Sequence, residues 1–331
     1  MAAASLDVVG IGNAIVDVLA HADDAFIAGQ GLAKGGMTLI DPDRADALYA
    51  AMGPGIEMSG GSAGNTMAGI ASLGGTGAYI GKVRDDFLGK VFRHDITAIG
   101  VRFSTPDATD GPGTARCLIL VTPDAQRTMC TYLGACVALG PDDVDEELIA
   151  KAQVTYLEGY LFDPPQAKAA FRKAAAAAHA AGRKVSLSLS DPFCVNRHRD
   201  EFLDLVAGHV DILFANEAEI CALYRTDDFE KAAAAVRGHC EIAALTRSEK
   251  GSVVVTGSDT HVVPAAAVAR VVDTTGAGDL YASGFLYGLT HGRDLPGCAR
   301  LGGLCAAEII SHFGARPEEP LAALAAKAGL A

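Results

Sequence analysis

The residues best suited to chemistry form a run of small side chains that closes on an acid, Asp273-Thr274-Thr275-Gly276-Ala277-Gly278-Asp279. The residues that follow predict a helix, because they carry an apolar stripe at helical spacing, Ala282, Phe285, Leu286 and Leu289. Small residues at a helix start leave backbone N–H groups unpaired at the positive end of the helix dipole, which makes an anion hole. Asp279 either complements that dipole or accepts a proton from a hydroxyl that attacks a bound phosphate. No G-x-x-x-x-G-K-[ST] pattern occurs, so a P-loop is excluded as the phosphate binder.

A second glycine-rich segment, Gly60-Gly61-Ser62-Ala63-Gly64, matches the G-x-S-x-G nucleophile elbow of α/β-hydrolases. An elbow needs a strand that leads into the serine, and Pro54–Ser59 has the composition of a loop, which argues against Ser62 as a nucleophile. The alternative is a glycine loop that caps a helix. Such a loop lets a small ligand contact bare backbone amides, and Asn65 lies one turn further on.

Asn216-Glu217-Ala218-Glu219 has two readings, both of which the sequence leaves open. Asn at a helix N-cap with Glu three residues later is a capping box. The same two side chains, Asn216 and Glu219, could hold Mg²⁺ through water, because magnesium keeps most of its waters. The histidines and cysteines show no zinc spacing, and Gly10–Ile15 lacks the third glycine of a dinucleotide fingerprint.

The elements expected to position these motifs alternate between strand and helix. Six short β-rich runs are separated by helix-length segments, which predicts βαβ units and a mainly parallel sheet: 7–11, 77–80, 154–157, 184–189, 211–214 and 242–246. Two regions, 12–40 and 113–133, interrupt this alternation with extra strands that should form a separate small layer or lid. The second reads as a hairpin of Ala115–Val121 and Gln126–Tyr132 around the turn Thr122–Ala125.

Composition restricts the class of protein. The chain has 331 residues, 50% hydrophobic and 20% charged, which is typical of a folded globular protein. The net charge of −13 disfavours nucleic acid as a partner. Apolar runs are too short to span a bilayer, and the first basic residue is Lys34, so neither a membrane anchor nor a secretion signal is expected. The eight cysteines contain no C-x-x-C pair, so we expect free thiols in the cytoplasm.

With these residues in view, the sequence from about residue 7 to 317 resembles the ribokinase-like (PfkB) family of sugar and nucleoside kinases. Two motifs carry the resemblance, Gly60–Asn65 and Asp273–Asp279. Within the family it is most similar to members that act on adenosine, through residues 12–17, 127–136 and 210–217. The resemblance implies a doubly wound α/β fold, with a mainly parallel sheet flanked by helices and a small β-sheet lid. It also implies that 1–331 is one kinase domain whose lid strands come from about 12–40 and 113–133.

The resemblance further implies ATP-dependent phosphorylation of the 5′-hydroxyl of a nucleoside, most often adenosine, by a monomer or homodimer. Asp279 would be the base, and the amides of Gly276, Ala277 and Gly278 would stabilise the transferring phosphoryl group together with Arg127. The remaining expected contacts divide between the two substrates. The nucleoside would be held by Asn13, Asp17, Gly61, Ser62 and Asn65, with Tyr160 as a stacking candidate. The nucleotide would lie near Thr246, Ser248, Gly251 and Gly278, with Mg²⁺ held through water by Asn216 and Glu219, and K⁺ as a further candidate cofactor.

Several alternatives stay open at this point. Ser248 stands where relatives often have glycine, which puts a close backbone contact to the nucleotide in doubt. Asp17 is the only charge in Ala14–Ala20 and would read the ribose diol, or else protect an edge strand from aggregation. Ser59–Tyr79 contains no basic residue, which favours a neutral acceptor over a sugar phosphate. The rival functions are a kinase for another nucleoside or for a free sugar (ribose, 2-keto-3-deoxygluconate), a non-catalytic nucleoside-binding protein, and a serine hydrolase.

Overall fold

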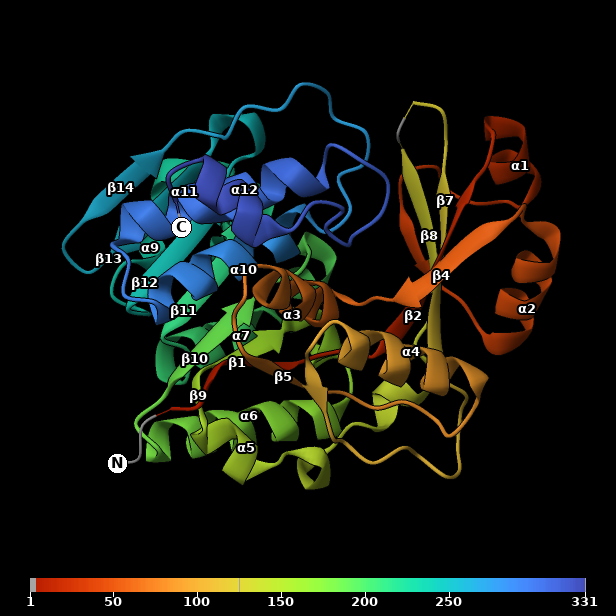
Figure 1. The fold of residues 1–331 in the computed structure, drawn as a ribbon, viewed down its shortest axis with the longest axis horizontal. Helices are drawn as coiled ribbons and strands as arrows, with labels where there is room; N and C mark the ends of the chain where they lie inside the picture. Colours follow the sequence, from red (N-terminus) through yellow and green to blue (C-terminus); the bar gives the residue numbers. More distant parts are fainter. Residues whose placement is uncertain (1–3, 125, 331) are drawn as a thin grey trace.

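The computed structural model describes residues 4–124 and 126–330, which form a large body with a smaller lid beside it (Figure 1). Within those residues, nine strands build the sheet of the body in the order β14-β13-β12-β11-β10-β9-β1-β5-β6. Their bounds are β1 Leu6–Ile11, β5 Gly77–Ile80, β6 Arg102–Phe103, β9 Ala152–Glu158, β10 Lys184–Ser188, β11 Ile212–Asn216, β12 Ile242–Thr246, β13 Ser252–Thr256 and β14 Thr260–Val263. The pairs from β6 to β12 are parallel, and β13 and β14 add an antiparallel edge.

Helices cover both faces of this sheet because successive strand residues point to opposite sides. Val8 of β1 packs in one apolar cluster and Val9 in the other. The helices that pack in the cluster of Val9 are α5 (Glu146–Ala150), α6 (Pro165–Ala180), α7 (Pro192–Gly208), α8 (Glu217–Tyr224) and α9 (Phe229–Val236). The helices that pack in the cluster of Val8 are α3 (Ser62–Ser72), α4 (Phe87–Ala98), α10 (Ala277–Thr290) and α11 (Leu295–Ile309). Helix α12 (Leu321–Lys327) packs with α11 and α3. The expected doubly wound fold is confirmed.

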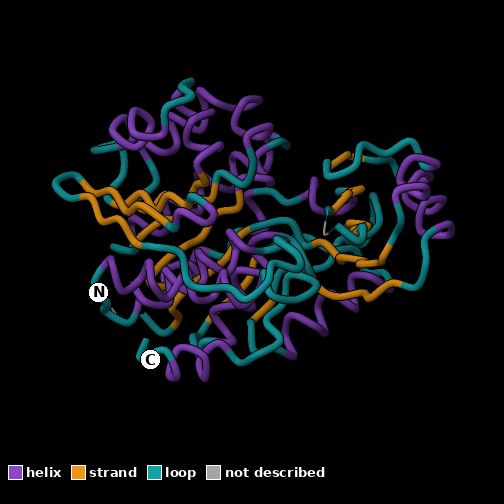
Figure 2. Tube along the Cα trace, turned by 90° about the horizontal axis from the view of Figure 1, so that it is seen from above, coloured by secondary structure: helices purple, strands orange, loops and turns teal. Residues whose placement is uncertain are grey.

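The lid is a second sheet, of five strands in the described part of the chain, in the order β3-β8-β7-β2-β4. The strands are β2 Ile15–His21, β3 Met37–Leu39, β4 Gly55–Ser59, β7 Ala115–Val121 and β8 Arg127–Tyr132. Two helices belong to the lid, α1 (Asp24–Gly29) and α2 (Pro42–Ala51), and viewed from above the whole unit projects to one side of the body (Figure 2). Ile27 and Leu48 of these helices pack against Val18 and Leu118 on one face of the sheet.

Three sequence expectations for the lid can be compared with the strands. The hairpin formed by β7 and β8 is antiparallel as predicted, and Ala125 of its turn lies outside the described residues. Pro54–Ser59 was expected to be a loop, and this was wrong: Gly55–Ser59 is β4, which pairs with β2. The edge-strand reading of Asp17 was also wrong, because β2 pairs with β7 on one side and β4 on the other.

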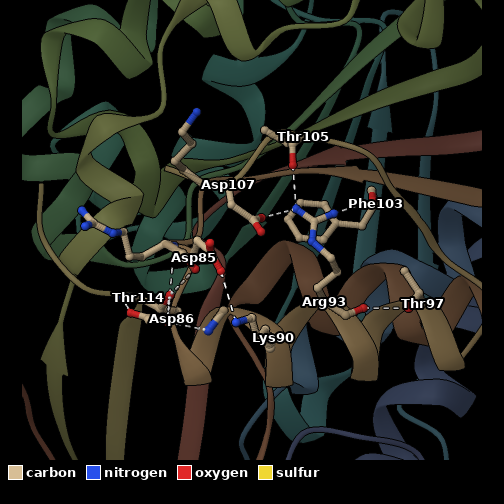
Figure 3. Close-up of polar contacts among 12 residues, drawn as sticks. Asp85, Asp86, Lys90, Arg93, Thr97, Phe103, Thr105, Asp107 and Thr114 are labelled. Carbon is tan, nitrogen blue, oxygen red and sulfur yellow. Dashed lines mark hydrogen bonds and ion pairs between the residues drawn. The ribbon is translucent and has the colours of Figure 1, made fainter. Parts of the chain in front are cut away.

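The chain enters β7 of the lid at a point fixed to the body by a carboxylate. Asp86 caps α4 by accepting the N–H of Gly89 at 2.8 Å, and its two oxygens also accept the hydroxyl and the N–H of Thr114, at 2.7 and 2.8 Å (Figure 3). Thr114 immediately precedes β7. In the same close-up Arg93 of α4 donates to the carbonyl of Phe103 at 2.9 Å and stacks over its ring. The start of β7 is therefore bonded directly to the N-terminal turn of α4 in the body.

Candidate active site

A cavity of about 1020 Å³ lies between the lid and the body. It is lined from the lid by alternate residues of β2, β7 and β8, because one face of that sheet points inward. All residues that the sequence singled out for the site line this cavity: Asn13, Asp17, Gly61, Ser62, Asn65, Arg127, Tyr160, Asn216, Glu219, Thr246, Ser248, Gly251, Gly276, Ala277, Gly278 and Asp279. The fold thus brings together motifs that are more than 200 residues apart.

The start of α10 has the geometry of an anion site. Its N-cap, Gly276, has φ 76° and no side chain, so it leaves the first-turn N–H groups without a side-chain cap. A Cβ at Gly276 would lie 3.1 Å from that of Ala315, so the left-handed backbone and the close approach both favour glycine. The N–H groups of this turn and the dipole of a 14-residue helix face the cavity.

Asp279 connects the two glycine motifs. Its Oδ1 accepts the hydroxyl of Ser62 at 2.6 Å, and its Oδ2 accepts the amide of Asn65 at 2.9 Å. Withdrawal from solvent raises the pKa of Asp279, and these two hydrogen bonds with the charges of Arg316 and Arg127 partly oppose that rise. A carboxylate with a raised pKa, held in place at an anion site, is suited to accept a proton.

The hydrolase reading of Ser62 gains no support from these contacts. Its hydroxyl donates directly to a carboxylate, and among the described residues that line the cavity there is no histidine to act as the base of a triad. Contrary to the sequence expectation, a strand does precede the glycines. It is β4, which belongs to the lid sheet and not to the sheet of the body.

Arg127 reaches from β8 of the lid to the anion site. Its Nη1 donates to the hydroxyl of Thr275 at 2.9 Å, and its Nε lies 3.3 Å from Oδ1 of Asp273. Asp273 is fully buried, and its oxygens also accept the N–H of Thr275 at 2.9 Å and that of Gly314 at 3.0 Å. The lid therefore places a cation, paired with Asp273, beside the start of α10.

The glycine loop approaches the lid too closely for side chains. A Cβ at Gly60 would lie 2.0 Å from Oδ2 of Asp17, and Gly61 has φ 79° with its Cβ position 2.2 Å from the carbonyl of Asn13. Asp17 is 6% exposed, and burial raises its pKa to about 7, opposed by the charge of Arg316 and the N–H of Gly61. Asp17 and the bare backbone of the loop thus form one wall of the cavity.

Sequence reasoning missed several charged residues at the site: Glu158, Asp163, Arg197 and Glu249 line the cavity, and Arg316 bonds to Ser59 and Gly64 on either side of the glycine loop. Glu158 is 1% exposed, accepts the side-chain amide of Asn13 at 2.7 Å and the N–H of Ala63 at 2.8 Å, and has a pKa raised by burial to about 7. A signal for Glu158 existed, because it ends a strand at the edge where ligands bind in such sheets. Arg316 stands alone in the sequence, and no local pattern marks it.

The part of the cavity opposite the lid combines a capping box with one turn, between β12 and β13, that contains two residues of positive φ. Asn216 and Glu219 cap α8 reciprocally, with Nδ2 of Asn216 2.6 Å from Oε1 of Glu219. Burial raises the pKa of Glu219 to about 7. Ser248 has φ 50°, a conformation that favours glycine, and Gly251 has φ 86° with its Cβ position 2.1 Å from the carbonyl of Val263. The N–H of Tyr160 donates to Ser190 at 3.1 Å.

Comparison with known proteins gives a consistent result. The model of the "pfkB family carbohydrate kinase" matches residues 47–321. An adenosine kinase structure from Sinorhizobium meliloti is 55% identical, with a TM-score of 0.94 over 98% of this chain and 100% of that one. The adenosine kinase of Saccharomyces cerevisiae is 29% identical over 92% of this chain and 94% of its own length. An ATP-dependent ribose-1-phosphate kinase from Halopiger xanaduensis is 31% identical over 82% of this chain and 86% of its own.

In the described residues, no helix has the length and apolar character needed to cross a membrane.

Proposed function

The chain belongs to the pfkB family of carbohydrate kinases, and from this premise we propose that it transfers the γ-phosphoryl group of ATP to the 5′-hydroxyl of a nucleoside, with adenosine preferred. The observation that carries the proposal is Asp279, a half-buried carboxylate at the start of α10 that Ser62 and Asn65 hold in place. Because all eight cysteines are free thiols, we place the reaction in a reducing cytoplasm.

In the proposed reaction Asp279 accepts the proton of the 5′-hydroxyl as that oxygen forms its bond to the γ-phosphorus. The bond from the γ-phosphorus to the β–γ bridging oxygen breaks, and ADP leaves with the bonding electrons. The N–H groups of Gly276, Ala277 and Gly278, with the guanidinium of Arg127, stabilise the charge on the transferring group. The proton on Asp279 passes to solvent as the products depart.

The other expected residues bind and orient the two substrates. Asp17, Asn13, Gly61 and Asn65 hold the ribose hydroxyls, and each charge-assisted hydrogen bond contributes about 1.5–3 kcal/mol. The ring of Tyr160 is the stacking candidate for the base. Thr246, Ser248 and Gly251 line the cavity and would border the nucleotide.

The residues Asn216 and Glu219 fit a magnesium ion bound through water. The two oxygens of the 6% exposed Glu219 already accept the N–H and the side-chain amide of Asn216, so they would contact the ion only through water, and a nearby cation would favour the ionised carboxylate. When bound, Mg²⁺ neutralises charge on the phosphates of ATP.

The acceptor that we propose is a neutral nucleoside, although one relative is an ATP-dependent ribose-1-phosphate kinase. Arg316 does lie beside the glycine loop, but its Nη atoms donate to oxygens of Ser59 and Gly64 and are therefore engaged. ATP consumption measured with adenosine, other nucleosides, ribose, 2-keto-3-deoxygluconate and ribose 1-phosphate tests this choice. A preference for a sugar or sugar phosphate over adenosine would refute it, and adenosine binding without ADP release would indicate a non-catalytic binder.

The role of Asp279 is tested by Asp279→Asn, which keeps the shape and removes the base. We expect kcat to fall by about 10²–10⁴, since general-base catalysis contributes about that factor. ATP affinity, measured by calorimetry, should change little. Turnover equal to the wild type would show that Asp279 only caps the helix.

A further inference from the structure

The segment between α11 and α12 passes beside both motifs of the site. At its start the carbonyl of Ile310 accepts the N–H of Val272 at 2.8 Å, and the N–H of Gly314 donates to Oδ2 of the buried Asp273 at 3.0 Å. Ala315 then packs against the N-cap Gly276 of the anion site. The next residue, Arg316, turns toward the glycine loop.

The guanidinium of Arg316 bridges the two sides of that loop. Its Nη1 donates to the carbonyl of Gly64 in α3 at 2.7 Å. Its Nη2 donates to the hydroxyl of Ser59 at 2.8 Å and also to the Ser59 carbonyl. Ser59 is fully buried and ends β4 of the lid, and its N–H donates to Asp95 at 2.7 Å. One side chain therefore fixes the end of a lid strand relative to the helix that carries Ser62 and Asn65.

The same guanidinium is one of two positive charges, with that of Arg127, that act on the carboxylates of the site. Withdrawal from solvent lowers the pKa of Arg316, and the carboxylates of Asp95, Asp17 and Asp279 act in the opposite direction. An arginine stays charged under such conditions. Its Nε is buried without a hydrogen-bond partner in the described structure, so the contact is maintained at some cost.

We propose that Arg316 is a positioning residue for the phosphoryl transfer: its guanidinium holds the glycine loop in register with Asp279 and places a positive charge at the segment whose side chains bind this carboxylate. The inference rests on the proposed function, because it assumes that Asp279 is the base. It differs from a purely structural role in one respect: loss of the charge raises the proton affinity of Asp279 even where Ser62 and Asn65 stay bonded to it, and the lysine variant, which keeps the charge, separates the two effects.

Other groups face Asp279 and must be considered in any titration. Ser62 and Asn65 donate to it, and Arg127 adds a second positive charge from the lid. The groups that add negative charge or an ionisable hydroxyl near it come from β2, from β9 and the turn after it, and from α8: Asp17, Tyr156, Glu158, Tyr160 and Glu219. The charge of Arg316 also opposes the raised pKa of Asp17, so a shifted kcat/KM limb contains the titration of both carboxyls, and the NMR titration below isolates that of Asp279.

The test compares Arg316→Gln, Arg316→Lys and the control Arg293→Gln. Arg293 also donates to a backbone carbonyl, that of Leu330 at 2.9 Å, and its Nε is likewise buried without a partner. In Arg316→Gln we expect the acid limb of the kcat/KM profile to move up by about one pH unit, because an opposite charge nearby lowers a carboxyl pKa by about that much or more. Arg316→Lys keeps the positive charge, so it should return the acid limb close to its wild-type position. The bridging hydrogen bonds are lost in this variant, so KM for the nucleoside should stay raised. Arg293→Gln should lower the melting temperature and leave the profile unchanged.

A ¹³C-carboxyl NMR titration of Asp279, assigned with Asp279→Asn, provides a readout without activity. We expect its midpoint to be higher in Arg316→Gln than in the wild type. An unchanged midpoint and an unchanged pH limb would overturn the inference while leaving the kinase proposal intact. Absence of turnover in the wild type with every acceptor would instead refute the proposed function, and the NMR titration would still decide whether Arg316 sets the charge of Asp279.

Discussion

Asp17, Glu158 and Glu219 are three nearly buried carboxyls whose pKa values burial raises to about 7. They lie around one cavity, so before substrate binds these carboxyls are partly protonated near neutral pH. Hydroxyls, amides and a cation from bound substrates favour the ionised forms. Substrate binding should therefore release protons, and the site is less stable alone than when filled.

This arrangement predicts an effect of Asp17→Asn on stability that depends on pH. A free aspartate titrates near 3.9, whereas Asp17 titrates at about 7 when folded, so between these values the folded state binds more protons than the unfolded state. The wild type should then lose stability as pH rises from about 4 to 7. The Asn variant lacks that loss, so its melting temperature relative to the wild type should rise between pH 5 and pH 8.

The control is Asp110→Asn, at an exposed position, which should show a difference independent of pH. The same Asp17→Asn variant should bind adenosine more weakly at pH 8, because a carboxylate accepts two hydroxyl hydrogens and an amide oxygen is a weaker acceptor. A pH-independent melting difference would mean that Asp17 is ionised in the empty protein.

The site residues that could be predicted from the sequence are those that belong to contiguous motifs. Asp279 was recognisable because small residues precede it and a helix follows. Glu158 and Arg316 were not recognised, because each acts on a segment far from it in the sequence: Glu158 on Asn13, and Arg316 on Ser59, 257 residues away. Single charged residues of this kind are far more often solvent-exposed, and only the fold shows that these are not.

At the scale of elements, the turn between β12 and β13 shows a conflict between residue type and backbone. Ser248 has φ 50°, where a side chain costs roughly 1–2 kcal/mol relative to glycine. We expect Ser248→Gly to stabilise the protein by up to about 1 kcal/mol, because glycine also gains freedom in the unfolded chain. If this turn borders the nucleotide, KM for ATP should change as well.

Arg225 offers a matched control, since it ends α8 with the same φ of 50°. Arg225→Gly should relieve a similar strain without altering KM for ATP. Thermal melts and initial rates measure both effects. Equal KM values in the wild type and Ser248→Gly would place the nucleotide away from this turn.

Elements were predicted where hydrophobic pattern and length agreed. The parallel strands from β1 to β12 are buried on both faces and read as short apolar runs. β4 was missed because its sequence, GIEMS, has a glycine and sits half exposed in the lid, so apolar content did not mark it. The antiparallel edge of β13 and β14 was missed because the βαβ alternation gives no reason to expect a hairpin after β12.

At the scale of the whole molecule, the net charge of −13 opposes the approach of ATP, which is itself an anion. The favourable charge of Arg127 and the α10 dipole acts only near the site. Raising ionic strength from about 10 to 150 mM shortens the Debye length from about 30 to 8 Å and should increase the association rate constant of ATP. Adenosine is neutral and should associate at a constant rate.

Stopped-flow measurements with choline chloride as the added salt, at fixed K⁺ and Mg²⁺, separate this effect from specific ion binding. An association rate that falls with salt would show that the local positive site dominates the approach of ATP.

The contact of Arg316 with Ser59 also sets an order of events while the protein is made. Ribosomes add roughly 5–20 residues per second, so Arg316 follows Ser59 by roughly 13–50 s. During that interval β4 and α3 can form, but the loop between them has no guanidinium to bridge it. A nascent chain can therefore possess most of its sheet and still hold its acceptor site loosely. If Arg316 positions this loop as proposed, the ability to transfer phosphate is acquired late, when one arginine far along the message has been translated.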